Sequence, residues 1–342
     1  MSHLTRSHRP RSRPLRAVSR LGFGLAALAA VACLGLPRDA AAQRPVTVSV
    51  LYGPQKPQAL IWYRMAEILE EKLPGQFKFN VVTDGALGGE KETAEGVQLG
   101  SIHAALSTVA NMQTWVPQGA IFDMPFMFRD IDHIQTALSG PIGDEFKQLY
   151  AEQGFKVFGF IVYGARHVIS KEPIETPADV EGKKMRVLQS PLHVELWKSL
   201  GANPTPVPIT EAYNALETGV VDYMDMTMSG YHALKLYEVV PSFTRTAHIW
   251  ALGVMYMSMN YWESLTDEQK AAFEEAAAEA IPYFNRIAAE EQEKSLALAV
   301  EKGATVVEPD VGPWREAMAE FWQSYAPNVG GLEKVQAIAD VE

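Results

Sequence analysis

Strand patterns and helical patterns alternate along this chain, and this alternation limits its fold more than any other feature of the sequence. Apolar residues recur at every second position in residues 46–52 and 77–83, which predicts two strands. Helical spacing in residues 59–73 and 90–99 predicts that a helix follows each strand. A β-α-β-α order packs helices on a largely parallel sheet, so we expect the α/β fold class.

The same order starts again in the second half of the chain, after a predicted strand at residues 155–163. Residues 184–188 predict a strand, and further helices and strands follow it. A capping box at residues 266–269 starts a helix that can run to Lys302, about 50 Å at 1.5 Å per residue. Pro282 should kink it near its middle. We expect two α/β lobes and one helix long enough to span both.

The first 42 residues have the pattern of a cleaved secretion signal. Several arginines precede an apolar run at residues 21–36, and small residues follow at 40–42. We expect cleavage after Ala42 and a periplasmic mature protein. The single cysteine, Cys33, lies in this leader, so the mature chain has no disulfide and no thiol chemistry. An alternative is a lipid anchor on Cys33, for which Ala30 is a poor match.

The charge of the mature chain argues against nucleic acid as a partner. The full sequence has a formal net charge of −11, with 30 basic and 41 acidic residues. The leader contains seven arginines and one aspartate, so its removal leaves 23 basic and 40 acidic residues and a charge of −17. Such a chain repels a phosphate backbone. No later segment has 18 uninterrupted apolar residues, so the sequence predicts no membrane span.

Motifs of enzymes and metal sites are weak in this sequence. The glycine-rich residues 85–89 lie between a predicted strand and helix, but their spacing matches no nucleotide-binding motif and indicates a tight turn. Neither H-E-x-x-H nor G-x-S-x-G occurs. Methionines alternate in residues 224–228 and 255–259, which fits either a soft copper(I) site or the buried faces of two strands. We expect no metal and no cofactor.

Two arginines stand out because they are close to the ends of predicted strands. Arg166 and Arg186 follow or interrupt apolar runs, and open α/β sheets bind ligands at the carboxyl ends of their strands. A guanidinium in an apolar strand needs a carboxylate partner. That partner is either an acidic residue of the protein or the carboxylate of a ligand, and spacing alone does not decide between them.

From these arginines onward the sequence resembles the extracytoplasmic solute-binding proteins of TRAP transporters, the DctP type. The motifs that carry this resemblance are GAR at 164–166, TPADVEGKKMRV at 176–187, LGANPTPV at 200–207 and EAYNALETGVVD at 211–222. Upstream, ALGGE at 86–90, VQLG at 97–100 and FDMPFMF at 122–128 fit the same family. The likeness covers nearly the whole mature chain in the same order.

The resemblance implies a two-lobed flytrap fold that closes over a small organic acid and delivers it to an ion-gradient-driven membrane permease. It implies lobes at residues 43–163 plus about 252–291, and 164–251 plus about 292–342. In this family the arginine at Arg186 grips the ligand carboxylate, and the one at Arg166 assists. The other positions that the resemblance assigns to the pocket are Tyr52, Gln55, Thr108, Asn111 and Trp250.

The chain departs from the family pattern after Val221-Asp222, where many relatives have Gly-Gln-Glu-Asn. Met226 takes the place of a polar pocket residue, which favours a less hydroxylated carboxylate, and Asp225 is a further pocket candidate. Two alternatives stay open at this point. One is a periplasmic enzyme that uses Asp222, Asp225 or His248 on an organic acid, and the other is a ligand-reporting partner of a membrane sensor.

Overall fold

The computed structural model describes residues 43–342, so the predicted signal at 1–42, its cleavage site after Ala42 and the lipid site at Cys33 lie outside the described residues. The strands are β1 (Arg44–Ser49), β2 (Phe77–Val82), β3 (Ala104–Thr108), β4 (Phe155–Ser170), β5 (Lys184–Val187), β6 (Asn203–Pro206), β7 (Tyr223–Thr227), β8 (Ser242–Ser258) and β9 (Thr305–Val307). The helices are α1 (Pro57–Lys72), α2 (Glu90–Leu99), α3 (Val109–Met112), α4 (Ile131–Leu138), α5 (Pro141–Glu152), α6 (Pro191–Ser199), α7 (Ile209–Glu217), α8 (Met228–Ala233), α9 (Met259–Glu263), α10 (Asp267–Glu301), α11 (Gly312–Tyr325) and α12 (Leu332–Ala339).

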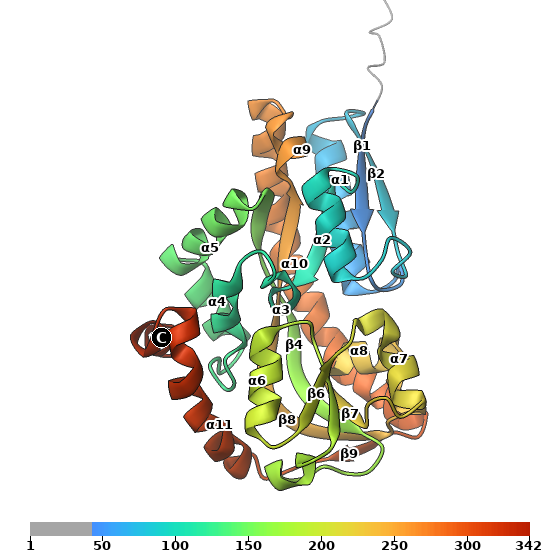
Figure 1. The fold of residues 1–342 in the computed structure, drawn as a ribbon. Coiled ribbons are helices and arrows are strands. Elements are labelled where there is room, and N and C mark those ends of the chain that lie inside the picture. Colours follow the sequence, from blue (N-terminus) through green and yellow to red (C-terminus); the bar gives the residue numbers. More distant parts are fainter. Residues whose placement is uncertain (1–42) are drawn as a thin grey trace, which may run out of the picture. The chain divides into compact units, whose positions relative to one another are not determined.

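All nine strands form one mixed sheet, which confirms the α/β class (Figure 1). Its order is β2-β1-β3-β8-β4-β7-β5-β6, with β9 paired to β8. Parallel pairs join β1 to β2 and β3 on one side, and β5 to β6 and β7 on the other. The expectation of a largely parallel sheet is wrong at the centre, where β3, β8, β4 and β7 pair antiparallel. The two parallel groups are therefore joined through β8 and β4.

The joining strands are longer than the sequence pattern predicts. β4 has 16 residues and β8 has 17. The predicted strand end at residue 163 is not an end, because the chain stays extended through Gly164, which adopts φ +124°, and continues to Ser170. Gly164 pairs with Ala251 of β8 after a register shift that follows Val162. A glycine in a buried strand marks a bulge here and not a turn.

Helix α10 begins as predicted. Thr266 and Gln269 form the capping box, and the helix runs for 35 residues with Pro282 inside it. It lies along β4 and packs on α1 at one end and on α8 toward the other (Figure 1). A second capping box, formed by Thr176 and Asp179, starts only a single 3-10 turn, Pro177–Val180.

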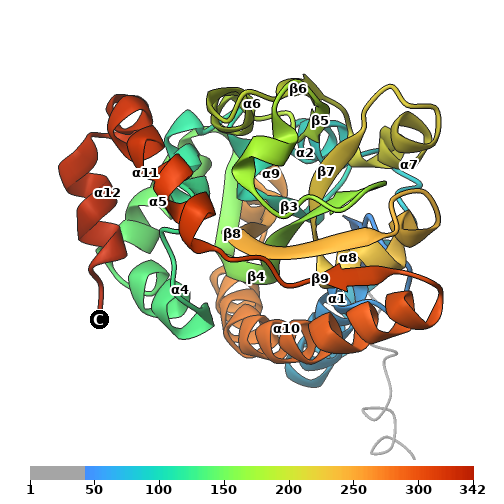
Figure 2. The same cartoon turned by 90° about the horizontal axis from the view of Figure 1, so that it is seen from below.

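Three hydrophobic clusters form the core, and all of the alternating methionines except Met259 belong to two of them. Met224 and Met226 are buried in the cluster around α7 and α8, whereas Met255 and Met257 are buried in the cluster between α1 and α10. The largest cluster extends to α11 and α12, which lie beside α4 and α5 (Figure 2). The methionines therefore pack in separate cores, as buried faces of strands do. In residues 43–342 no helix has the length and apolarity that crossing a membrane requires.

Candidate functional site

A small cavity lies where β3, β4, β7 and the segment after β1 meet. Four of the predicted pocket residues line it, namely Tyr52, Thr108, Arg166 and Met226. Sequence reasoning missed the others, which are Gln58, Glu90, Tyr163, Thr227 and Ala251. These residues come from both parallel groups of the sheet and from the central strands. The mixed apolar and polar lining is that of a site for a small molecule.

Glu90 organises the wall on the β1–β3 side. It is the first residue of α2, and its carboxylate accepts hydrogen bonds from the backbone N–H of Thr108 at 2.9 Å and from the Thr108 hydroxyl at 2.8 Å. The amide of Asn111 also donates to it. Thr108 in turn caps α3 by accepting from the N–H of Asn111. The predicted residues Thr108 and Asn111 are thus brought together, and both hold the carboxylate that faces the cavity.

Arg166 is paired with an acidic residue of the protein. Its Nε and Nη2 donate to the two carboxylate oxygens of Asp225 at 2.7 Å each, and Nη2 also donates to the Asp225 carbonyl at 2.8 Å. His248 contacts the same carboxylate at 3.2 Å. Burial raises the pKa of Asp225, but the charge and hydrogen bonds of Arg166 outweigh it and hold that pKa well below its usual value. Asp225 does not line the cavity itself, whereas Arg166 does.

Arg186 is in the opposite situation. It is only 2% exposed, and within residues 43–342 its single protein hydrogen bond runs from Nε to the Val207 carbonyl at 2.9 Å, with no acidic side chain in ion-pair range. Burial, and then the neighbouring charge of Arg166, lower its pKa to about 10. A guanidinium that remains charged and buried without a carboxylate is an energetically unfavourable arrangement. Its terminal nitrogens are therefore available to an anion from outside the protein.

The phenol of Tyr52 is influenced by the charges of Glu90, Arg166 and Arg186. Burial raises the pKa of its phenol, and Glu90 raises it further, while Arg166 and Arg186 act in the opposite direction. The phenol therefore stays protonated at neutral pH and can donate a hydrogen bond. Tyr52 lines the cavity, whereas Arg186 does not, although the charge of Arg186 acts on the Tyr52 phenol. Among the described residues Arg186 has no acidic side chain in ion-pair range, whereas Arg166 is paired with Asp225.

Two predicted pocket residues lie elsewhere. Gln55 is exposed in the loop before α1, and Gln58, the second residue of α1, lines the cavity in its place. Trp250 lines a neighbouring cavity with Tyr163 and Gly164. The position of Glu90, directly after the glycine-rich turn at 85–89, was a sequence feature that could have identified it as a pocket residue. Gln58 and Tyr163 had no such signal, because only the fold brings them to the site.

The glycine-rich turn and the other candidate groups have structural roles. A side chain at Gly85 would come within 3.8 Å of Thr210, so this turn already lies against the start of α7. Asp222 accepts from the backbone of Lys184 at 2.9 Å on the surface. His248 is fully buried, and its other ring nitrogen pairs with Thr246 at 2.7 Å. Within the described part of the chain, no three His, Cys, Asp or Glu side chains form a metal site.

A model of the bacterial extracellular solute-binding proteins, family 7, known as DctP, matches residues 49–328. The chain belongs to this family. The DctP family is made up of substrate-binding receptors and not of enzymes, which sets aside the alternative of catalysis by Asp222, Asp225 or His248. Membership of this family also explains why the sequence motifs and the fold agree.

Related proteins cover most of this DctP-family chain. A solute-binding protein of Verminephrobacter eiseniae is 31% identical over 300 residues, which is 87% of this chain and 90% of that protein. The 2,3-diketo-L-gulonate-binding periplasmic protein of Escherichia coli is 31% identical over 242 residues, 70% of this chain and 74% of that one.

Solved structures agree with the fold. A TRAP periplasmic solute-binding protein of Xanthobacter autotrophicus with bound β-D-galacturonate superimposes with a TM-score of 0.82 at 27% identity, covering 87% of this chain and all of that one. One from Sulfurospirillum deleyianum with bound succinate gives 0.83 at 27%, covering 88% of this chain and 100% of that chain. The fold of the DctP-family chain is therefore the two-lobed fold of these receptors.

Proposed function

We propose that this chain is the periplasmic receptor of a TRAP transporter and that Arg186 captures the carboxylate of a small organic acid. The observation that carries the proposal is the buried guanidinium of Arg186, which has no acidic partner in residues 43–342. A ligand carboxylate supplies that partner through two parallel charge-assisted hydrogen bonds. Relatives with bound galacturonate and succinate support a carboxylate as the ligand.

The predicted lobes fit this role. The first comprises residues 43–163 and about 252–291, and the second comprises 164–251 and about 292–342. Both contribute to the cavity, so that closure brings the first lobe's wall against Arg186 and removes water from the site. Drying strengthens the charge-assisted hydrogen bonds of the captured carboxylate. The loaded receptor then delivers the acid to a membrane permease, or, in the alternative role, reports it to a membrane sensor.

The cavity lining favours a small acid with few hydroxyl groups. Met226 lines the cavity and offers no useful hydrogen bond to a hydroxyl. Besides Arg166, the polar lining residues that remain for the rest of the ligand are Tyr52, Gln58, Glu90, Thr108 and Thr227. In this assignment Asp225 acts by fixing Arg166, Asn111 acts by fixing Glu90, and neither contacts the acid directly.

A thermal-shift screen of monocarboxylates, dicarboxylates and sugar acids tests the proposed function. At a ligand concentration of 100 times Kd, stabilisation should be about 2.7 kcal/mol. Mass spectrometry of the recovered ligand should show it chemically unchanged. If no carboxylate raises the melting temperature while other solutes do, the proposal is wrong, and a converted ligand would restore the enzyme alternative.

Export makes a separate prediction about the N-terminus. The mature protein is expected to start at or near Gln43, because the small residues 40–42 provide the cleavage site. Intact-mass measurement of protein recovered from the periplasm checks this. A mass that includes a diacylglyceryl group on Cys33 would show instead that the protein is anchored by a lipid.

A further inference from the structure

The pairing of β4 with β8 is interrupted beside the cavity. Val162 pairs with Leu252 and Gly164 pairs with Ala251, so Tyr163 is an extra residue on β4. Such a β-bulge takes backbone groups out of the regular ladder, and buried backbone groups need other partners. The ring of Tyr163 lines the ligand cavity, which makes the position of this bulge important for the site.

Two amide side chains of α10 supply the partners. Asn285 Oδ1 accepts a hydrogen bond from the Val162 N–H at 3.0 Å, and Gln292 Nε2 donates to the Tyr163 carbonyl at 2.8 Å. The two residues are about two turns apart on the same face of the helix. The long helix is therefore joined to the bulge by hydrogen bonds on both sides of Tyr163.

Gln292 also forms hydrogen bonds with Ser229 of α8. Its Nε2 donates to Ser229 Oγ at 3.1 Å, and its Oε1 accepts from the Ser229 N–H at 3.3 Å. Ser229 comes two residues after Thr227, which lines the ligand cavity. Gly164 makes room for this arrangement, because a Cβ there would be 2.8 Å from the Gln292 side chain. One amide thus connects the bulge of β4 with the junction of β7 and α8.

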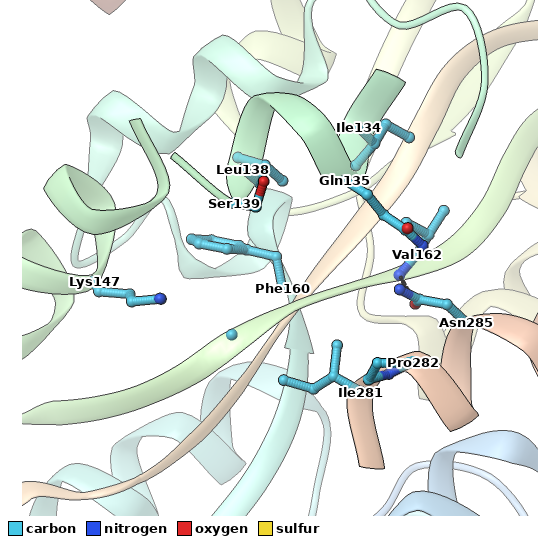
Figure 3. A pocket seen from close by; sticks show the side chains of 11 residues that line it. Ile134, Gln135, Leu138, Ser139, Lys147, Phe160, Val162, Ile281, Pro282 and Asn285 are labelled. Atoms are coloured by element: carbon cyan, nitrogen blue, oxygen red, sulfur yellow. Dashed lines mark hydrogen bonds between the residues drawn. The ribbon is translucent and has the colours of Figure 1, made fainter. Parts of the chain in front are cut away.

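The contact between α10 and β4 is open on both sides of these bonds. A cavity lies between α4, β4 and the helix, with Phe160, Ile281, Pro282 and Asn285 among its lining residues (Figure 3). Gly164 and Gln292 are among the residues that line a second cavity. Pro282 removes one backbone hydrogen bond of α10 next to the first cavity. Helix and strand therefore have space to move relative to each other, and the amide bonds select one arrangement.

We propose that Gln292 is a positioning residue for ligand capture, which holds the Tyr163 bulge and the β7–α8 junction in the arrangement that forms the closed cavity. This inference rests on the proposed function for its binding readout. Gln292 acts through Tyr163 and Ser229 and does not contact the acid. Its effect should therefore fall on closure more than on the stability of the ligand-free fold.

The test compares Gln292→Met, which keeps side-chain length and removes the amide, with Gln148→Met on the surface of α5. Gln148 is exposed and its amide reaches only Glu152, so the same chemical change there is a matched control. For the acid with the largest thermal shift, Gln292→Met should raise Kd at least tenfold and slow association, and Gln148→Met should do neither. Small-angle scattering at saturating acid should show a more open Gln292→Met protein.

Hydrogen exchange in the ligand-free protein gives a readout that needs no ligand. The Ser229 amide should exchange faster in Gln292→Met than in wild type, because its acceptor has been removed. If the methionine variant does not fold, Gln292→Asn, whose amide is one methylene too short to reach both partners, should give the same changes. The inference is wrong if these variants have the same Kd, the same scattering profile and the same Ser229 exchange rate as wild type. If wild type binds no carboxylate, the proposed function is wrong instead. Ser229 exchange would still test the hydrogen bonds between Gln292 and Ser229.

Discussion

Replacing Arg186 with methionine is expected to abolish carboxylate binding without destabilising the protein. Arg186 is buried and unpaired by any acidic residue among those described, so the ligand-free fold loses an unfavourable charge when methionine takes its place. Two charge-assisted hydrogen bonds to the ligand, at about 1.5–3 kcal/mol each, correspond to a loss of more than about a hundredfold in affinity. Calorimetric titration and thermal melting of the same preparation measure both effects.

Arg186→Lys is the matched control, because it keeps the charge and loses the planar fork. Its affinity should fall by more than about tenfold and remain above that of Arg186→Met. The melting temperature of Arg186→Met should equal or exceed that of wild type. A variant that melts far below wild type and still binds the acid with unchanged affinity would show that Arg186 serves the fold and not the ligand.

Replacing Arg166 with alanine is expected to reduce the stability of the protein more than its affinity for the ligand, the opposite of Arg186→Met. Its removal leaves the Asp225 carboxylate buried with only His248 beside it. Breaking a buried ion pair in this way reduces the free energy of unfolding by about 3–5 kcal/mol. Urea denaturation of Arg166→Ala measures this loss. The double variant Arg166→Met/Asp225→Leu removes both charges and should recover most of the stability.

The pH dependence of stability provides a second check on the Arg166 variant. In wild type the folded-state pKa of Asp225 is held well below its ordinary value. The ionised carboxylate therefore stabilises the fold above pH about 4, and this stabilisation is lost as the pH falls through the folded-state pKa. In Arg166→Ala, burial without the arginine raises that pKa above the unfolded value, so the variant should recover stability as the pH falls toward 4. Parallel pH profiles for the two proteins would contradict the pairing as the source of the stability.

The local elements could be predicted from the sequence because their signals are local. The capping box at Thr266 and the alternation in β1 and β2 each depend on a few neighbouring residues, and the structure contains all three. The central strands could not be predicted in full. Gly164 has the local signature of a turn, and only the pairing with Ala251 keeps the chain extended through it.

The site was predictable to the same extent. Arg166 and Arg186 were identified as arginines that need a carboxylate, but their different partners depend on the position of Asp225, which is 59 residues from Arg166 in the sequence. The pairing of β4 with β7 places Arg166 opposite Thr227, two residues after Asp225. No spacing rule assigns that aspartate to one arginine and leaves the other free, because the choice is made by strand register.

The pairing of β3 with β8 has a consequence for the order in which the chain can fold. Ala104 pairs with Met257, and β1 reaches the rest of the sheet only through β3. The sheet that begins at residue 44 therefore stays incomplete until residues 242–258 have been synthesised. Contacts this distant in sequence form slowly, because a long loop must close before they contribute. We expect the N-terminal segments to remain without a finished core until the last third of the chain has emerged.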